Sequence, residues 1–87
     1  MELRMEMVKN FPKIEKFFTK EALLKFAKTL PKNLGEYNWG LGTMIRLKML
    51  GPKNRLYKLF VQRGYTDKEE MTMEVIRRFH KHICDKI

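Results

Sequence analysis

Apolar side chains recur at helical spacing over much of this chain, and this periodicity limits the possible folds more than any other feature. In residues 19–30 the apolar positions share one face of a helical wheel, and the same holds for residues 55–63 and 73–87. Residues 43–50 are apolar nearly all round, which is typical of a helix at the centre of a core. The sequence therefore predicts an all-α fold, a small array of about four helices. The expected inner face of the last helix comprises Met73, Ile76, Phe79, His80, Ile83 and Ile87.

Capping residues set the expected limits of these helices. Thr19 suits the N-cap of the first helix, and Pro31 would end it. Asn54 can cap the third helix, with Gly64 as its C-terminal glycine. Thr72 can cap the last helix, which we therefore expect to begin after it.

Two segments have no clear helical pattern. Residues 1–8 alternate apolar and polar side chains as strands do, yet their methionines and glutamates favour helix. We therefore expect residues 1–18 to form a loose N-terminal arm or a short helix, and residues 19–87 to form a single helical domain. Residues 32–39 are expected to form a loop.

His80, His82 and Cys84 have a spacing that suggests metal ligands. On a helix, residues two positions apart diverge by about 200°, so His82 leaves the face that His80 and Cys84 share. Two ligands do not complete a zinc site, and the same pair lacks the third group that would orient a nucleophile and base. We expect a buried His80, an exposed His82, and a protein without metal, cofactor or enzymatic activity.

Positive charge is concentrated in the middle of the chain. The formal net charge is +9, and no acidic residue occurs between Glu36 and Asp67. A stretch of one sign is an argument for anionic partners rather than for a fold. The residues predicted to bind an anion or a partner are Gly40, Gly42, Arg46, Lys48, Lys53, Arg55, Lys58 and Arg63.

Gly40 and Gly42 precede the apolar segment and admit two interpretations. Helix N-termini favour anions, so two glycines could expose amides to a phosphate. They can equally serve a tight turn that lets Trp39 and Leu41 pack. The structural interpretation is the one we favour, because the preceding strand of a dinucleotide-binding motif is absent from the sequence pattern.

Arg46 lies in a segment otherwise suited to burial, and a buried guanidinium needs a partner. The acidic residues Asp67, Glu69 and Glu70 offer one, and a structural ion pair is the interpretation we favour. The alternative is that Arg46 is an anion ligand beside the glycine turn.

The single cysteine, Cys84, allows no intramolecular disulfide. The first residues lack the apolar run of a signal peptide, and no apolar stretch approaches the length that spans a membrane. These features predict a cytoplasmic protein without an integral membrane segment.

Three groups of residues resemble a family of small uncharacterised bacterial helical domains. They are the run from Gly40 to Arg46, which fits Gly-x-Gly-x-x-Ile-Arg; the residues Leu56, Phe60 and Gly64; and the run Met71-Thr72 with Ile76, Phe79 and His80. The resemblance covers roughly residues 34–84 and departs at Leu47-Lys48, where polar amides and a longer loop are expected. It implies a helical fold and a bacterial cytoplasmic setting, and no activity.

Two functions fit these patterns. The one we favour is a non-enzymatic protein-interaction module that binds its partner through an apolar patch bordered by basic residues. The alternative is nucleic-acid or anionic-ligand binding through the basic segment 46–63, for which the lysines and arginines could lie along a phosphate backbone. The sequence leaves homo-oligomer formation open.

Overall fold

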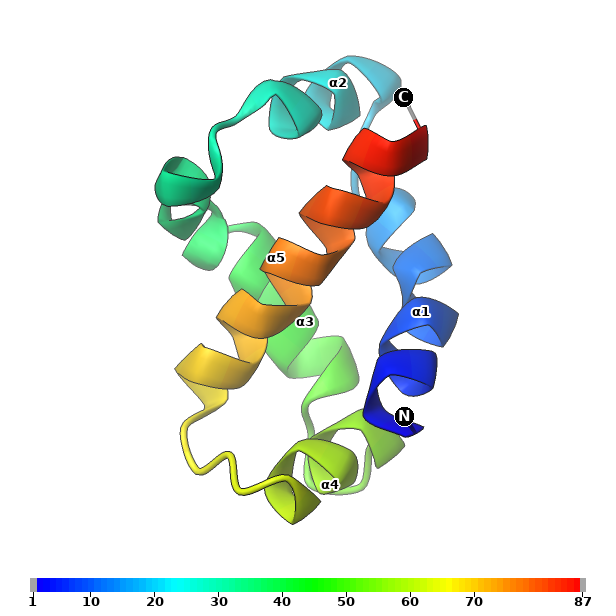
Figure 1. The fold of residues 1–87 in the computed structure, drawn as a ribbon, viewed down its shortest axis with the longest axis vertical. Helices are drawn as coiled ribbons and strands as arrows, with labels where there is room; N and C mark the ends of the chain where they lie inside the picture. Colours follow the sequence, from blue (N-terminus) through cyan, green and yellow to red (C-terminus); the bar gives the residue numbers. More distant parts are fainter. Residues whose placement is uncertain (1, 87) are drawn as a thin grey trace.

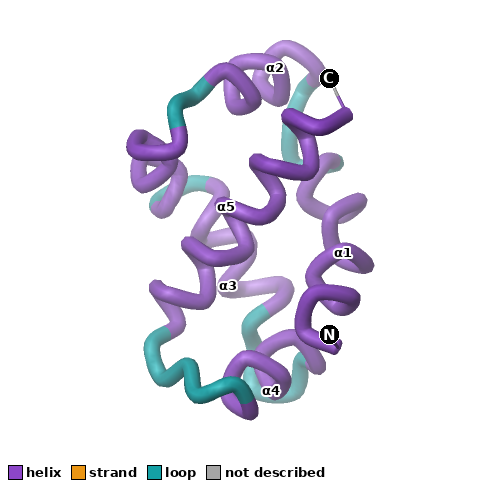
Figure 2. The backbone as a smooth tube through the Cα atoms, viewed as in Figure 1, coloured by secondary structure: helices purple, strands orange, loops and turns teal. Residues whose placement is uncertain are grey.

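The computed structural model describes residues 2–86, which form six helices and no strand (Figure 1, Figure 2). The all-α prediction is confirmed, although the helices outnumber the four that we expected. In chain order they are α1 (Glu2–Glu15), α2 (Lys20–Lys28), the 3₁₀ helix η1 (Pro31–Asn38), α3 (Leu41–Met49), α4 (Arg55–Gln62) and α5 (Lys68–Lys86).

The long helix α5 crosses the front of the molecule, with α1 beside it and α3 behind it (Figure 1). Helices α2 and α4 close the two ends. The centre is an aromatic cluster around Phe79, which meets Phe11 at 5.5 Å, Phe26 at 5.6 Å and Phe18 at 6.2 Å between ring centroids. Because these rings come from α5, α1, α2 and the turn after α1, one cluster holds both halves of the chain together.

Of the two expectations for residues 1–18, the loose arm is wrong, because most of the segment is a helix. Residues from Glu2 to Glu15 form a regular helix that contains Pro12. Its buried residues recur about one helical turn apart, at Leu3, Met7, Phe11 and Ile14. The strand-like alternation was misleading because its middle member faces the solvent: Met5 is 64% exposed, whereas Met7 is 2% exposed.

Helix α5 begins earlier than its predicted cap. The side chain of Asp67 accepts a hydrogen bond from the Glu69 amide at 2.9 Å, and the helix starts at Lys68. Thr72 lies within the helix and is fully buried. Its hydroxyl is satisfied there because it donates to the Lys68 carbonyl at 2.7 Å. The buried face comprises Met71, Thr72, Val75, Ile76, Phe79, His80 and Ile83, with Met73 half-buried beside it. Ile87, which we assigned to this face, lies outside the described residues.

Helix α3 is also less enclosed than expected. Leu41, Gly42, Ile45 and Met49 are buried, but Leu47 is 78% exposed. One face of α3 therefore packs on the core and the other reaches the solvent. The predicted loop 32–39 is largely the helix η1, whose Leu34 is buried.

Several predicted boundaries are confirmed. Thr19 caps α2 by accepting from the Ala22 amide at 3.1 Å, although the helix ends before Leu30, which is exposed. Asn54 occupies the N-cap position of α4, but its side chain accepts from the Gly51 amide instead. Gly64 follows α4 with a φ of 92°, a conformation that favours glycine.

Candidate interaction groove

The predicted site residues lie in two parts of the fold, along α3 and around α4. Gly40, Gly42 and Arg46 lie at the start and middle of α3, and Lys48 lies near its end. The remaining four residues surround two adjoining shallow hollows beside Glu2 of α1, and they are Lys53, Arg55, Lys58 and Arg63.

Gly42 lies where α3 packs tightly against α5. A Cβ atom at this position would lie 3.1 Å from the Thr72 methyl group and 3.1 Å from the Asn38 side-chain oxygen. Gly40, by contrast, has open space around it. This packing gives Gly42 a structural role, since a larger side chain would require its neighbours to shift. Leu41 is buried as expected, but the expectation that Trp39 also packs is wrong, because Trp39 is 80% exposed.

Arg46 is held by η1 and not by the acidic residues that we expected. Its guanidinium donates to the Asn38 side-chain oxygen at 2.9 Å and to the Asn38 carbonyl at 3.0 Å. The Asn38 amide in turn donates to Glu69 at 3.4 Å. The predicted ion pair of Arg46 is therefore wrong for the described residues, because Asn38 lies between the two charges.

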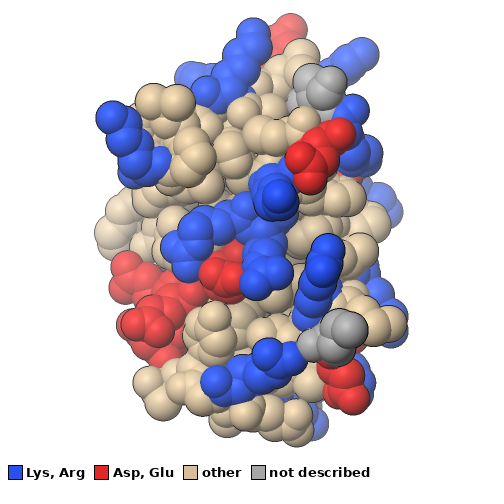
Figure 3. All heavy atoms as spheres, viewed as in Figure 1, with Lys and Arg blue, Asp and Glu red and all other residues tan. Residues whose placement is uncertain are grey.

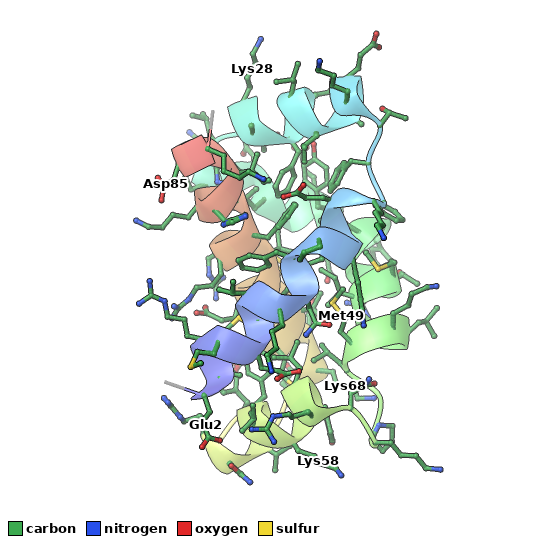
Figure 4. All side chains as sticks on the ribbon, turned by 90° about the vertical axis from the view of Figure 1, so that its right-hand side faces the viewer. Glu2, Lys28, Met49, Lys58, Lys68 and Asp85 are labelled. Atoms are coloured by element: carbon green, nitrogen blue, oxygen red, sulfur yellow. The ribbon has the colours of Figure 1, made fainter. Side chains whose placement is uncertain are left out.

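The α4 end of the basic stretch receives carboxylates from α1. Arg55 lies 3.6 Å from Glu2 and 3.4 Å from Glu6. Figure 4 shows α1 in front of the core, with Glu2 at the end nearest α4. Within residues 2–86, Lys53, Lys58 and Arg63 make no ion pair. In the folded chain, acidic residues of α1 thus lie beside part of the acid-free stretch.

A second basic surface is a groove between the end of α1 and the outer face of α3, which we call the Phe17 groove. It is a shallow space of about 590 Å³ lined by Lys13, Lys16, Phe17, Met44 and Lys48. Phe17 is 49% exposed, and Met44 is half-buried against the core. No carboxylate is among the lining residues, so an apolar centre lies between three ammonium groups.

The exposed apolar surface continues along α3. On a helix Leu47 lies about 60° around the axis from Met44, on the same outer side. Leu47 is 78% exposed, and Trp39, just before the helix, is 80% exposed. These are the two most exposed large apolar side chains among residues 2–86. Exposed apolar patches with a polar border are typical of interaction sites.

Sequence reasoning found Lys48 but missed Lys13, Lys16 and Phe17. The i, i+3 spacing of the two lysines beside an aromatic residue was visible in the sequence. The signal is lost because the sequence leaves the conformation of residues 1–18 open between an arm and a short helix, so the direction of these side chains is not set.

His80 is buried, as predicted, and its ring meets the Phe26 ring edge-on at 5.2 Å. The Cys84 sulfur lies 3.7 Å from the nearer ring nitrogen. His82 is only one-third exposed, because its ring packs on Phe11 at 4.8 Å and lies 3.8 Å from Glu15. Within residues 2–86, no three histidine, cysteine, aspartate or glutamate side chains gather as a metal site would require.

A smaller charged cluster lies on α5 around Glu74. On α5, burial raises the pKa of Glu74, but hydrogen bonds and charges from Arg78 at 2.7 Å and Arg77 at 2.9 Å outweigh it and hold that pKa below its ordinary value. Figure 3 shows the acidic side chains at the start of α5 on the lower left of this face. There Asp67, Glu69 and Glu70 line a shallow hollow.

The comparison with known families matches most of the chain. Residues 6–83 match the family described as "Domain of unknown function (DUF6794)". The chain belongs to this family. No curated protein and no solved structure matches it.

The DUF6794 match includes both walls of the Phe17 groove, since it begins within α1 and ends within α5. It agrees with the expected membership in an uncharacterised family, and it extends further toward the N-terminus than the resemblance did. The Gly-x-Gly-x-x-Ile-Arg motif and the bacterial origin stay predictions. None of the helices described in this DUF6794 member is long and apolar enough to cross a membrane.

Proposed function

We propose that this DUF6794 protein is a non-enzymatic protein-interaction module and that the Phe17 groove is its binding surface. The observation that carries the proposal is a half-exposed phenylalanine beside a methionine, bordered by lysines on both walls. The same proposal includes a bacterial cytoplasmic setting: its bacterial part rests on the family resemblance, and the free Cys84 agrees with a reducing compartment.

The physical reason is the free energy of the exposed apolar surface. Covering it with a partner gains about 25 cal/mol for each Å² removed from water. Aromatic residues and methionine are enriched at protein interfaces, and methionine adapts its shape to what it contacts. The lining residues Phe17 and Met44 supply this kind of surface, and Leu47 extends it along the outer side of α3.

A second candidate is nucleic-acid or anionic-ligand binding through residues 46–63. It is favoured by Lys53, Lys58 and Arg63, which make no ion pair within the described residues. Against it, the two arginines Arg46 and Arg55 already bond to other parts of the protein. A phosphate backbone would meet a set of cations that is partly neutralised, so we rank this function second.

Photo-crosslinking in the cells that produce the protein tests the proposal. A photoreactive phenylalanine analogue replaces Phe17 in one variant and Val61 in a matched control, because Val61 is 48% exposed and lies on α4. We expect protease-sensitive adducts of defined mass from position 17 and few from position 61. Equal adducts at both positions would contradict the groove as the binding surface, and nuclease-sensitive adducts would favour the second candidate.

A further inference from the structure

The charge of the Phe17 groove has one sign. Lys13 comes from α1, Lys16 from the turn after it and Lys48 from α3, and no carboxylate lines the space between them. We propose, resting on the function proposed above, that the groove binds an acidic amphipathic helix of a partner protein. The partner's apolar side chains would contact Phe17 and Met44, and its carboxylates would face the three lysines, which we call the groove lysines.

The groove lysines have no internal partner, whereas several other cations of the molecule do. Lys86 pairs with Glu15 at 3.0 Å, and Arg77 and Arg78 both pair with Glu74. In the part of the chain that the structure describes, the groove lysines make no ion pair. Three like charges held around one apolar centre repel one another, and a partner with carboxylates at the same positions removes that repulsion.

The form of the partner follows from the walls of the groove. An extended peptide gains its main-chain hydrogen bonds from the open edge of a sheet. Residues 2–86 contain no strand, so they offer no such edge. A groove between two helices, with an aromatic ring and a methionine at its centre, suits the apolar face of a third helix instead.

A second copy of this chain is a poorer occupant. Each copy carries a formal net charge of +9, so two copies repel each other over long distances. The matching acidic surface of a copy would be the hollow lined by Asp67, Glu69 and Glu70. Such a contact would join unlike surfaces, and it would continue from copy to copy unless it closed into a ring.

Nucleic acid and anionic membranes would also be attracted to lysines. A duplex offers charge along its backbone but no apolar side chains for Phe17 and Met44 to contact. The apolar centre of the groove therefore favours a protein, and the other two occupants are distinguished by experiment.

The test uses three synthetic peptides of about 18 residues, a length at which an isolated helix begins to form. The first carries leucines at helical spacing on one face and glutamates elsewhere. The second replaces each glutamate by lysine, and the third replaces each leucine by alanine. Binding to the full chain is measured by calorimetry at physiological salt. We expect the first peptide to bind at least about tenfold more tightly than the other two, because only it has both features that the groove complements.

A charge-matched pair of variants separates the groove from the general positive field. The groove variant is Lys13→Glu, Lys16→Glu and Lys48→Glu. The control variant makes the same change in net charge at Lys53, Lys58 and Arg63, which lie outside the groove. We expect the groove variant to bind the first peptide at least about tenfold more weakly than the wild type, and the control to lose less than about threefold. Circular dichroism checks that both variants fold.

The methyl resonance of Met44 reports the place of binding. It should shift when the first peptide is added, whereas that of Met5, which is exposed elsewhere on α1, should not. Equal losses in both variants, or equal binding of the first and third peptides, would overturn the acidic-helix assignment. Tighter binding of duplex DNA or of anionic vesicles than of the first peptide, or concentration-dependent self-association blocked by the groove variant, would also overturn it. If the peptides fail while crosslinks to a protein still form at position 17, the module stands and only its partner class is wrong.

Discussion

The acid-free stretch between Glu36 and Asp67 passes through two helices that the fold treats differently. At α4, Arg55 lies against Glu2 and Glu6 of α1, so part of the positive charge is balanced. At α3, Lys48 lies near Lys13 at the end of α1 and Lys16 in the turn that follows it, so the positive charge is reinforced. The comparison shows that the charge of a surface is set by which distant segment packs beside it, and that α1 supplies both signs.

We expect the largest loss of stability from a change that disturbs the packing of α3 on α5. In Gly42→Ala the new methyl group would lie 3.1 Å from the Thr72 methyl group and from the Asn38 side chain. The crowded side chains must shift to admit the methyl group, and the higher helix propensity of alanine offsets part of that cost, so we expect a net loss of about 1–2 kcal/mol in the free energy of unfolding. Urea denaturation followed by circular dichroism measures it.

Gly40→Ala is the control for this change, because nothing lies within 4 Å of its added Cβ. We expect it to alter stability by no more than about 0.5 kcal/mol. A control that lost as much as Gly42→Ala would show that both glycines are needed for the turn and not for the contact with α5.

The α4 side is tested by reversing the charge that α1 balances. Arg55→Glu would place a third carboxylate beside Glu2 and Glu6, and we expect it to destabilise the fold by about 0.5–1 kcal/mol at low salt. Lys58→Glu on the same helix is the matched control, since Lys58 makes no ion pair within residues 2–86. The difference between the two variants should shrink at 1 M salt, where screening is strong; a difference that persists would mean that Arg55 acts through packing.

The smallest effect on stability is expected at the groove. Lys48→Glu places a carboxylate near Lys13 and Lys16, which relieves the repulsion among three ammonium groups. We therefore expect the free energy of unfolding to stay within about 0.5 kcal/mol of the wild type or to rise slightly. A loss greater than about 1 kcal/mol would mean that Lys48 has a structural role, and the contrast with Arg55 would fail.

Local signals predicted much of the fold. The position of Thr19 at the start of α2, the glycine after α4 and the burial of His80 follow from short-range geometry, and all three are confirmed. Thr72 misled because a threonine inside a helix can bond back to a carbonyl one turn earlier, so a good capping residue need not be a cap. The alternation around Met5 misled for another reason. A strand repeats every two residues and a helix about every four, so both patterns predict burial at every second apolar position.

The candidate site could be predicted only in part, for a different reason. Lys48 stood out because it lies in the stretch between Glu36 and Asp67 that has basic but no acidic residues. Lys13 and Lys16 gain their significance from the contact between the end of α1 and α3, and no local pattern encodes that contact. The same long-range packing placed Asn38 between Arg46 and Glu69, which local charge spacing did not predict.

The exposure of Trp39 has a consequence for how this protein is observed in solution. It is the single tryptophan of the chain and is 80% exposed, so its indole is hydrated in the folded state and in the unfolded chain alike. Intrinsic fluorescence will therefore report unfolding poorly. The same indole lies just before α3, so a shift of its emission to shorter wavelength on mixing with a partner would signal that the surface around the start of this helix has left water.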